Sequence, residues 1–278
     1  MGARLLVVAV PIGNLEDITL RALRSLREAE VIACEDTRRT GQLLELLGLS
    51  RPILLALHDH NEGRQVERVL ELLRSGKKVV LVSDAGTPTI SDPGFPLIRA
   101  VAEAGLTVVP VPGPCAAVAA LSASGLPTDQ FRFLGFPPGR PDARRAALEV
   151  LQGAPETLVF YVGPHDLADY LVLAAEVLGR ERPAVIAREL TKMYEEFRRG
   201  TLGELAAEPG TLRGEVVLIV GGATRHAEAT TVEDLAVAAR AVLAEGFTGA
   251  RAAKELSRRT GVSRDEAYRA ALAARGDV

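Results

Sequence analysis

The feature that most restricts the fold is a regular alternation of short apolar runs and helical patterns over the first 125 residues. Apolar runs predict strands at 5–11, 31–34, 53–57, 78–83 and 107–112. Helical patterns lie between and after them, near 19–29, 40–47, 62–75, 94–104 and 114–124. Such alternation is typical of βαβ units, in which a mostly parallel sheet is covered on both faces. Because ligands bind at the carboxyl ends of such strands, functional residues are expected in the loops after them.

A second set of apolar runs begins after a Gly- and Pro-bearing segment at 122–131, which has the composition of a hinge. These runs are less evenly spaced and predict a mixed sheet from strands at 132–136, 157–162, 184–190, 194–202 and 215–222. We therefore expect an α/β protein with one α/β domain over 1–122, a second over 123–226, and a helical extension over 227–278.

The extension is predicted to be helical and is basic at its end. A helix is expected at 231–245, and the following helical pattern breaks at Thr260-Gly261, where Ser263 and Glu266 have the spacing of a capping box. Residues 251–278 contain seven Arg and Lys against four Asp and Glu. This helix-turn-helix pattern favours a nucleic-acid contact, although a helical hairpin that only covers the core fits the pattern equally well.

Composition excludes several classes of protein. Two widely separated cysteines, Cys34 and Cys115, argue against a secreted disulfide scaffold and favour the cytoplasm. No apolar run has the length of a membrane span, and the first one is expected to be a buried strand that ends near Pro11. An aromatic content of 4%, without Trp, disfavours a single-strand binder built on stacking platforms.

The segment 83–94, SDAGTPTISDPG, is the strongest local indication of a site. It directly follows an expected strand and contains Asp84, Gly86, Asp92 and Gly94. Glycine allows backbone conformations and close ligand approach, and the carboxylates can accept hydrogen bonds. Because a purely structural loop rarely needs this density of special residues, we favour a functional role.

Other loops after strands carry weaker indications. The loop at 10–17 has a single glycine, Gly13, so it lacks the G-x-G-x-x-G pattern and disfavours a nicotinamide enzyme. The segment 34–41 presents Arg38 and Arg39, which would suit a phosphate; the alternative is a helix capped by Thr37 with solvated charges. The segment 110–117 contains a rigid Pro-Gly-Pro turn that opens a helix of small residues.

Two segments carry titratable side chains. His58 and His60 stand beside Asp59, but no H-E-x-x-H or paired cysteines accompany them, so we expect no metal site. The segment 187–192, ARELTK, ends an expected strand with Glu189 and Lys192, which suggests substrate orientation or base catalysis; a surface ion pair is the alternative. A G-x-S-x-G hydrolase pattern is missing from the sequence.

Eight motifs together resemble one family. They are PIGNLEDIT, EDTRRTG, LHDHNE, SDAGTPTISDPG, PGPCAA, LSASGLP, ARELTK and GEVVLIV, in this order. In order and spacing they are similar to the tetrapyrrole methylase superfamily (class III methyltransferases), in its bacterial branch that methylates the 2′-hydroxyl of a cytidine in 16S ribosomal RNA. The resemblance implies two α/β domains with S-adenosylmethionine in the cleft between them, a homodimer, and 16S rRNA or the small ribosomal subunit as partner.

Site residues carried over on this resemblance, or assigned from the chemistry that it implies, fall into three groups. The expected cofactor contacts are Pro11, Gly13, Asp84, Ala85, Gly86, Thr89, Cys115, Ala116, Val162 and Leu190. The expected catalytic residues, one of which would accept the proton of the ribose hydroxyl, are Glu189, Lys192 and Asp36, and Asp92 is a further candidate for this base. The expected RNA contacts are Arg38, Arg39, His60, Asn61, Asp92, Arg258, Arg259 and Arg264.

The chain departs from the family pattern in one loop, and alternatives remain. It reads FYVGPHD at 160–166, where the family more often reads FYES-x-HR, which puts a substrate role of this loop in doubt. A tetrapyrrole-type or other small-molecule methylase would act without the basic tail. A diphthamide-pathway methylase would modify a protein side chain. A non-catalytic RNA-binding module would need neither the segment 83–94 nor a cofactor.

Overall fold

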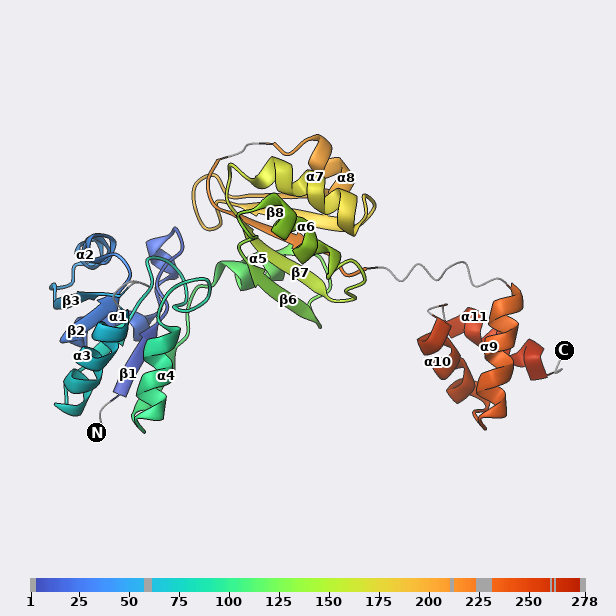
Figure 1. Cartoon of the computed structure of the whole chain (residues 1–278), viewed down its shortest axis with the longest axis horizontal. Coiled ribbons are helices and arrows are strands. Elements are labelled where there is room, and N and C mark those ends of the chain that lie inside the picture. Colours follow the sequence, from blue (N-terminus) through green and yellow to red (C-terminus); the bar gives the residue numbers. More distant parts are fainter. Residues whose placement is uncertain are drawn as a thin grey trace. The chain divides into compact units, whose positions relative to one another are not determined.

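The computed structural model describes residues 4–57, 62–210, 213–223, 232–260, 262 and 264–275. Its first sheet has the strand order β3-β2-β4-β1-β5, and every pair in it is parallel (Figure 1). The strands are β1 (Arg4–Val8), β2 (Val31–Cys34), β3 (Ile53–Ala56), β4 (Val79–Leu81) and β5 (Thr107–Val111). The predicted parallel sheet is therefore confirmed, and the carboxyl ends of all five strands meet at one edge.

Helices alternate with these strands. They are η1 (Leu15–Asp17), α1 (Leu20–Glu28), α2 (Thr37–Leu46), α3 (Glu62–Arg74) and α4 (Phe95–Glu103). Thr19 caps α1 by accepting a hydrogen bond from the backbone NH of Ala22. Asp36 caps α2 in the same way, through the NH of Arg38. Asp36 rather than Thr37 is therefore the cap, and α2 begins three residues before the predicted start.

The second sheet has the order β6-β7-β10-β8-β9 and is mixed, as the sequence predicted. Only β6 and β7 are parallel; β10 is antiparallel to both β7 and β8, and β9 is antiparallel to β8. The strands are β6 (Phe131–Gly135), β7 (Thr157–Val162), β8 (Pro183–Arg188), β9 (Glu196–Thr201) and β10 (Val216–Val220). The start of β10 therefore lies beside the ends of β7 and β8, where a ligand can be reached from three strands.

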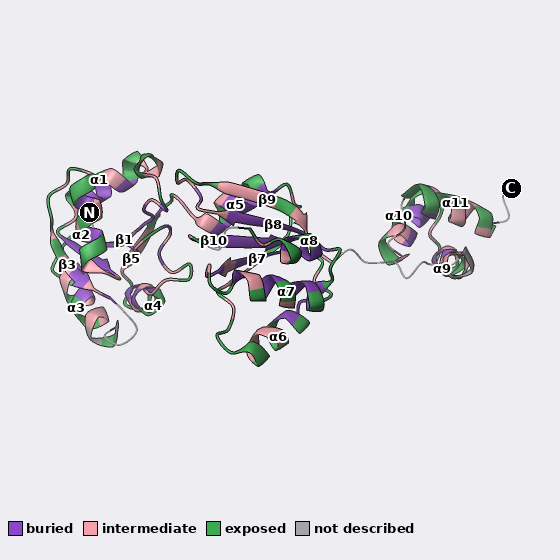
Figure 2. Ribbon diagram, turned by 90° about the horizontal axis from the view of Figure 1, so that it is seen from above, coloured by how far each residue is buried: buried purple, intermediate pink, exposed green. Residues whose placement is uncertain are grey.

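Four helices accompany the second sheet: α5 (Ala116–Ser124), α6 (Pro141–Glu149), α7 (Leu167–Leu178) and α8 (Leu202–Ala207). Small and apolar residues of α5 share a core cluster with residues of β7, β8 and β10, including Val159, Val185 and Val217. The expected domain boundary at residue 122 thus falls inside α5. We propose that the first α/β domain ends before this helix. Figure 2 shows buried residues concentrated in the central strands β7, β8 and β10 of the second sheet.

A buried arginine binds the backbone where the chain leaves β10 in the second sheet. The guanidinium of Arg182, which is 6% exposed, donates to the backbone oxygens of Gly221 (2.7 Å), Ala154 (2.9 Å) and Gln152 (3.2 Å). Three carbonyl acceptors satisfy the buried cation, which would otherwise be strongly unfavourable. The loop after α6 and the exit of β10 are thereby held together.

The chain divides into two compact units, Met1–Gly222 and Ala223–Val278. The second, here called the C-terminal helical unit, contains α9 (Val232–Ala244), α10 (Gly249–Thr260) and α11 (Arg264–Arg275). Its helices enclose a core of small residues around Val242 and Leu256. The predicted cap Ser263 lies outside the described residues. In the part of the chain that is described, every helix is too short or too polar to cross a bilayer.

Candidate functional site

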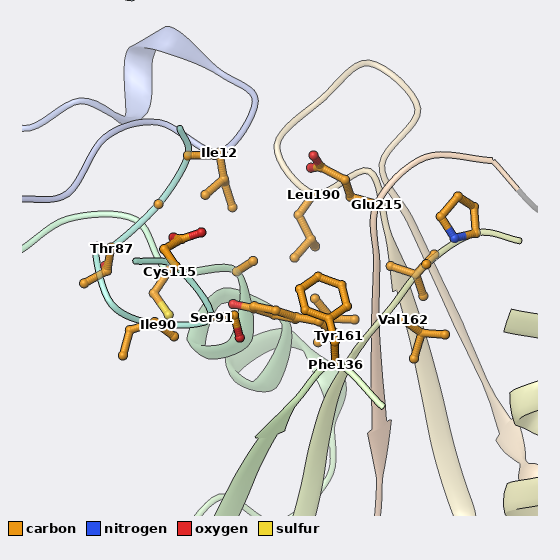
Figure 3. Close-up of a pocket in the computed structure, with 18 residues that line it drawn as sticks. Ile12, Thr87, Ile90, Ser91, Cys115, Phe136, Tyr161, Val162, Leu190 and Glu215 are labelled. Carbon is orange, nitrogen blue, oxygen red and sulfur yellow. The ribbon is translucent and has the colours of Figure 1, made fainter. Parts of the chain in front are cut away.

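A cavity of about 260 Å³ lies in the first compact unit, at the loops after strands of both sheets (Figure 3). We call it the main pocket. It is formed by the loops after β1, β4 and β5, by the start of α5, and by the ends of β7 and β8 with the start of β10. The residues that line it are Ile12, Ala85, Gly86, Thr87, Ile90, Ser91, Asp92, Cys115, Ala116, Phe136, Tyr161, Val162, Gly163, Pro164, Leu190, Glu215, Val216 and Val217.

Backbone pairing fixes the loop after β4 against the loop after β1. The NH and the oxygen of Gly86 exchange hydrogen bonds of 3.0 and 2.9 Å with Val10. Gly86 has a φ of 71°, and a Cβ there would lie 3.3 Å from Cγ2 of Ile12. The hydroxyl of Thr87 donates to the oxygen of Pro114 at 2.9 Å and so ties this loop to the one before α5. Glycine is needed at 86 because a side chain would be both strained and crowded.

Four residues other than glycine have positive φ in the described chain, and all four flank the main pocket. Thr89 (71°) and Ser91 (67°) stand on either side of Ile90, and Glu189 (50°) and Thr191 (66°) on either side of Leu190. Both central residues line the pocket. Positive φ costs a non-glycine residue on the order of 1 kcal/mol, and such residues gather at functional sites. The two loops therefore accept strain to present one apolar side chain each.

Two carboxylates face this mostly apolar pocket: Asp92 and Glu215. Burial raises the pKa of Asp92 to about 6, and the negative charges of Glu35 and Asp84 add to this effect, while a hydrogen bond from Ser83 opposes it. Asp92 is thus an ionised acceptor near neutral pH that gives up its charge in mild acid.

Aromatic rings form another part of the pocket wall. Tyr161 on β7 has its ring edge-on to Phe136, with centroids 5.5 Å apart, and to Phe133 at 4.9 Å. Its hydroxyl oxygen accepts a hydrogen bond from the NH of Ala117 in the first turn of α5. Burial raises the pKa of Tyr161 to about 12, so this phenol stays neutral. It positions α5 against the second sheet.

Glu189 and Lys192 form an ion pair in the turn that carries Leu190. Nζ of Lys192 donates to Glu189 at 2.9 Å and to Glu215 at 3.1 Å, and Glu189 also accepts from the backbone NH of Glu215. These bonds lower the pKa of Glu189. They raise the pKa of Lys192 against the opposing effect of its burial. Neither side chain is therefore suited to accept a proton at neutral pH.

A second, more open cavity lies at the ends of β2, β3 and β4, and we call it the outer hollow. It is lined by Glu35, Asp36, Thr37, Arg38, Arg39, Ala56 and Asp84. The carboxylate of Asp84 accepts from the NH of Asp36 at 3.0 Å and pairs with Arg39 at 3.3 Å. Hydrogen bonds from Arg38 lower the pKa of Asp36 to about 2. Asp36 is thus a helix cap and ion-pair partner, which disfavours a role as a base.

The structure brings some of the expected cofactor residues together and leaves others apart. Ala85, Gly86, Cys115, Ala116, Val162 and Leu190 line the main pocket, as does Asp92, which the sequence assigned to RNA. Pro11, Gly13, Asp84 and Thr89 are next to it without lining it. Gly13 instead lies against Lys192, whose Cγ would be 2.5 Å from a Cβ at that position. Arg258, Arg259 and Arg264 belong to the C-terminal helical unit, and His60 and Asn61 lie outside the described residues.

Pocket residues that sequence reasoning missed are mostly neighbours of those it named. Ile12 follows Pro11, Ile90 and Ser91 follow Thr89, and Tyr161 precedes Val162. Phe136 and Glu215 carried no sequence signal beyond their place at the edge of an expected strand. Among the described residues, no group of three or more His, Cys, Asp or Glu side chains is arranged to hold a metal ion.

A pocket at the strand ends of two successive α/β sheets, the first parallel and the second mixed, defines the class III methyltransferases. Residues 4–206 match the family of tetrapyrrole (corrin/porphyrin) methylases, and the chain belongs to this family. It is therefore a methyltransferase, and the family and fold expected from the eight motifs are confirmed.

Individual relatives agree with this family. The chain is 50% identical to "Ribosomal RNA small subunit methyltransferase I" of Escherichia coli O157:H7 over 79% of its length and 78% of the relative's. It is 47% identical to the protein of the same name from Xylella fastidiosa, covering 94% of this chain and 96% of that one. The crystal structure of uroporphyrin-III C-methyltransferase from Thermus thermophilus complexed with S-adenyl homocysteine shares its fold. That likeness has a TM-score of 0.56 at 22% identity and covers 79% and 97% of the two chains.

Proposed function

We propose that the protein transfers a methyl group from S-adenosylmethionine to the 2′-hydroxyl of a cytidine ribose in 16S ribosomal RNA of the small subunit. The observation that carries this proposal is the main pocket. Its lining is mostly apolar, and two of the loops that form it contain residues of positive φ, as ligand sites often do. The relatives that are 50% and 47% identical are named as ribosomal RNA small subunit methyltransferases, which supports the choice of substrate.

The chemistry of the main pocket fits S-adenosylmethionine. This cofactor carries a positively charged sulfonium and ammonium, apolar surface and ribose hydroxyls. Apolar side chains from both sheets, among them Ile12, Leu190 and Val217, would cover its surface. The carboxylates of Asp92 and Glu215 would accept hydrogen bonds from its cationic and hydroxyl groups. The structural neighbour that holds S-adenyl homocysteine supports this assignment.

Bound there, the cofactor supplies an electrophilic methyl group on sulfur. The contribution of this chain is alignment, because attacking oxygen, methyl carbon and sulfur must lie in line. Ile90 and Leu190 each stand between two residues of positive φ, and Leu190 also packs in a core cluster, so both side chains restrict how a ligand can lie. Apolar walls also exclude water, which would compete with the ribose as acceptor.

Glu189 and Lys192 were expected to be catalytic, and we propose a positioning role for them instead. Their ion pair ties the turn that carries Leu190 to Glu215 at the start of β10. The shifts of their pKa values, downward for Glu189 and upward for Lys192, disfavour either as a base. Asp36 is disfavoured by the same reasoning.

Arg38 and Arg39 in the outer hollow remain our candidates for contacts to RNA phosphates near the reacting ribose. The side chain of Arg38 is 86% exposed and that of Arg39 69% exposed. Their guanidinium groups can reach the phosphates of an RNA strand while keeping their ion pairs with Asp36 and Asp84.

The homodimer and the cytoplasmic location implied by the family resemblance are part of the same proposal. Sedimentation of the purified protein would test whether it is a homodimer.

Methyl transfer to defined RNA tests the proposal directly. Purified protein would be incubated with S-adenosylmethionine and small ribosomal subunits from a strain that lacks the corresponding gene. Mass mapping should reveal one new 2′-O-methylcytidine in the 16S RNA. Uroporphyrinogen III, offered in parallel, should remain unmodified. An unchanged RNA with a methylated tetrapyrrole would instead make this a small-molecule methylase.

A pair of variants links that activity to the main pocket. Ala116→Leu should fill the pocket and reduce methylation at least about a hundredfold, because Ala116 lines it. Val118→Leu on the same helix is the matched control, since Val118 is 55% exposed and outside the pocket. Calorimetry should show S-adenosylmethionine bound by the control and by the parent, and not by Ala116→Leu. If all three proteins bound S-adenosylmethionine equally well, the cofactor site would have to lie outside the main pocket.

A further inference from the structure

The C-terminal helical unit carries a basic groove between α10 and the start of α11. Two adjoining hollows there share the side chains of Arg251, Lys254 and Arg264. Arg251 and Lys254 are three residues apart and thus on one face of α10, and Arg264 opens α11. The three cations belong to different turns or helices and converge on one surface.

These three cations are free to bind a ligand, whereas the other basic residues of α10 are not. In the part of the chain that is described, the side chains of Arg251, Lys254 and Arg264 have no ion pair or hydrogen bond. Arg258 pairs with Glu255 at 2.6 Å. Arg259 bridges Glu255 at 2.7 Å and Glu245 at 2.6 Å.

The acidic side chains of the groove do not cancel its charge. Glu255 lines one hollow, but it is shared by Arg258 and Arg259, whose hydrogen bonds lower its pKa to about 2. Asp265 lines the other hollow and stands in the first turn of α11. Against Glu255 and Asp265, the two hollows present Arg251, Lys254, Arg258 and Arg264, so cations outnumber carboxylates.

An exposed aromatic ring stands next to the cations. Tyr268 lines the same hollow as Arg264, four residues further along α11, and is 45% exposed. Cations along a groove with an adjacent aromatic ring are the combination that holds the phosphates of a single strand and stacks one of its bases. An acidic protein partner would use the cations but would have no need of the ring.

We propose that the C-terminal helical unit binds a single-stranded part of the substrate RNA, with Arg251, Lys254 and Arg264 on its phosphates and Tyr268 against a base. This inference rests on the proposed function, because that function supplies RNA as the partner. It replaces the expectation that Arg258 and Arg259 make the phosphate contacts; these two arginines shape the unit through their ion pairs.

Binding of a fluorescent single-stranded oligoribonucleotide to the full chain tests the groove by anisotropy. The variant Arg251→Ala/Lys254→Ala/Arg264→Ala should lose affinity by on the order of tenfold or more. The slope of its log affinity against log salt should decrease by about 2, or about 0.7 per lost contact. The matched control is Arg240→Ala/Arg269→Ala/Arg275→Ala, which removes three charges of the same unit that line neither hollow. It should bind within about twofold of the parent.

Substitution of Tyr268 provides a second, independent test of RNA binding in the groove. Tyr268→Phe keeps the ring and should retain the affinity, whereas Tyr268→Ala should lose about fivefold to a hundredfold. The groove is contradicted by equal losses in both triple variants, by no loss in the first, or by a DNA duplex that competes as well as RNA. Circular dichroism must show intact helices in every variant.

Anisotropy and calorimetry together separate this inference from the proposed function. Calorimetry with S-adenosylmethionine reports on the main pocket and needs no RNA. If cofactor binding or ribose methylation fails while the groove variants still weaken RNA binding, the proposed function is wrong and the groove stands. If methylation occurs and the groove variants bind RNA like the parent, the groove alone is wrong.

Discussion

At the scale of single residues, Asp92 shows how function can oppose stability. Its pKa of about 6 lies above the ordinary value of 3.8 because its ionised form is partly buried and faces Glu35 and Asp84. The folded protein therefore holds the Asp92 proton more tightly than the unfolded chain does. Stability linked to this group is greatest below pH 4, falls as the pH rises from about 4 to 6, and stays lowered above 6.

Asp92→Asn should consequently have opposite effects on stability and on ligand binding. At pH 7.5 we expect the free energy of unfolding to rise by on the order of 1 kcal/mol, a figure that allows for the partial exposure of the group. Affinity for S-adenosylmethionine should fall about tenfold or more, because an amide cannot attract a cation as a carboxylate does. Urea titration and calorimetry measure the two quantities.

The pH dependence of the parent protein is the companion measurement. Its affinity for S-adenosylmethionine should weaken as the pH falls from 7 to below 6, as Asp92 takes up its proton, and the Asn variant should lack this decline. A parent whose affinity is level between pH 5 and 8 would exclude Asp92 as the acceptor for the cationic ligand.

At the scale of elements, the sequence predicted the strands better than the helices. A strand was predicted over every observed strand of both sheets. The signal is continuous in strands buried on both faces, such as β2 and β10, whereas β9 has no apolar run and none of its residues is buried. By contrast, α7 was not predicted: it buries seven of its twelve residues, and its exposed face is narrow, with only Asp169, Val172 and Glu176 on it. The β8 strand ends at Arg188, before the predicted 190, because the backbone turns to positive φ at Glu189.

The site could be predicted only to the level of its loops. The segments at 10–17, 83–94, 110–117 and 187–192 all contribute to the main pocket or adjoin it. Which residue of each segment faces the ligand depends on dihedral angles, and these brought Ile12 and Ile90 into the wall in place of Pro11 and Thr89. Glu215 reached the pocket through antiparallel pairing of β10, which the sequence did not specify.

Replacing Lys192 tests the ion pair that supports the β8–β9 turn. Lys192→Met should lower the free energy of unfolding by about 1–2 kcal/mol, because Glu189 loses its cation while facing Glu215. Lys78→Met is the matched control: its pair with Glu28 is more than half exposed, so we expect a change within about 0.5 kcal/mol. Equal losses in the two variants would show that the pair at Lys192 has no special role.

At the scale of the whole molecule, the chain consists of two compact units with separate cores. The exit of the first unit is secured by Arg182 at Gly221, so its fold is expected to be independent of the C-terminal helical unit. The cofactor pocket lies within the first unit, and the basic groove lies within the other. Binding of cofactor and binding of RNA are therefore expected to be separable.

A chain that ends after Gly222 should demonstrate this separation. We expect it to fold and to bind S-adenosylmethionine within about threefold of the parent, because every residue of the main pocket is retained. Its affinity for single-stranded RNA should decrease at least as much as in the groove variant. Loss of cofactor binding, in a truncated chain that still melts cooperatively, would contradict independent units.

The pairs of positive-φ residues around Ile90 and Leu190 have a consequence for how new specificities could arise. The backbone conformation on either side sets the direction of the Cα–Cβ bond at residues 90 and 190. This direction is therefore the same for any amino acid at these positions. Ile90, which is 37% exposed, can therefore be exchanged widely, whereas Leu190 also packs in a core cluster and allows only apolar replacements. Descendants of one ancestor could exchange these side chains to admit a different acceptor, and a laboratory library restricted to the two positions would explore the same route.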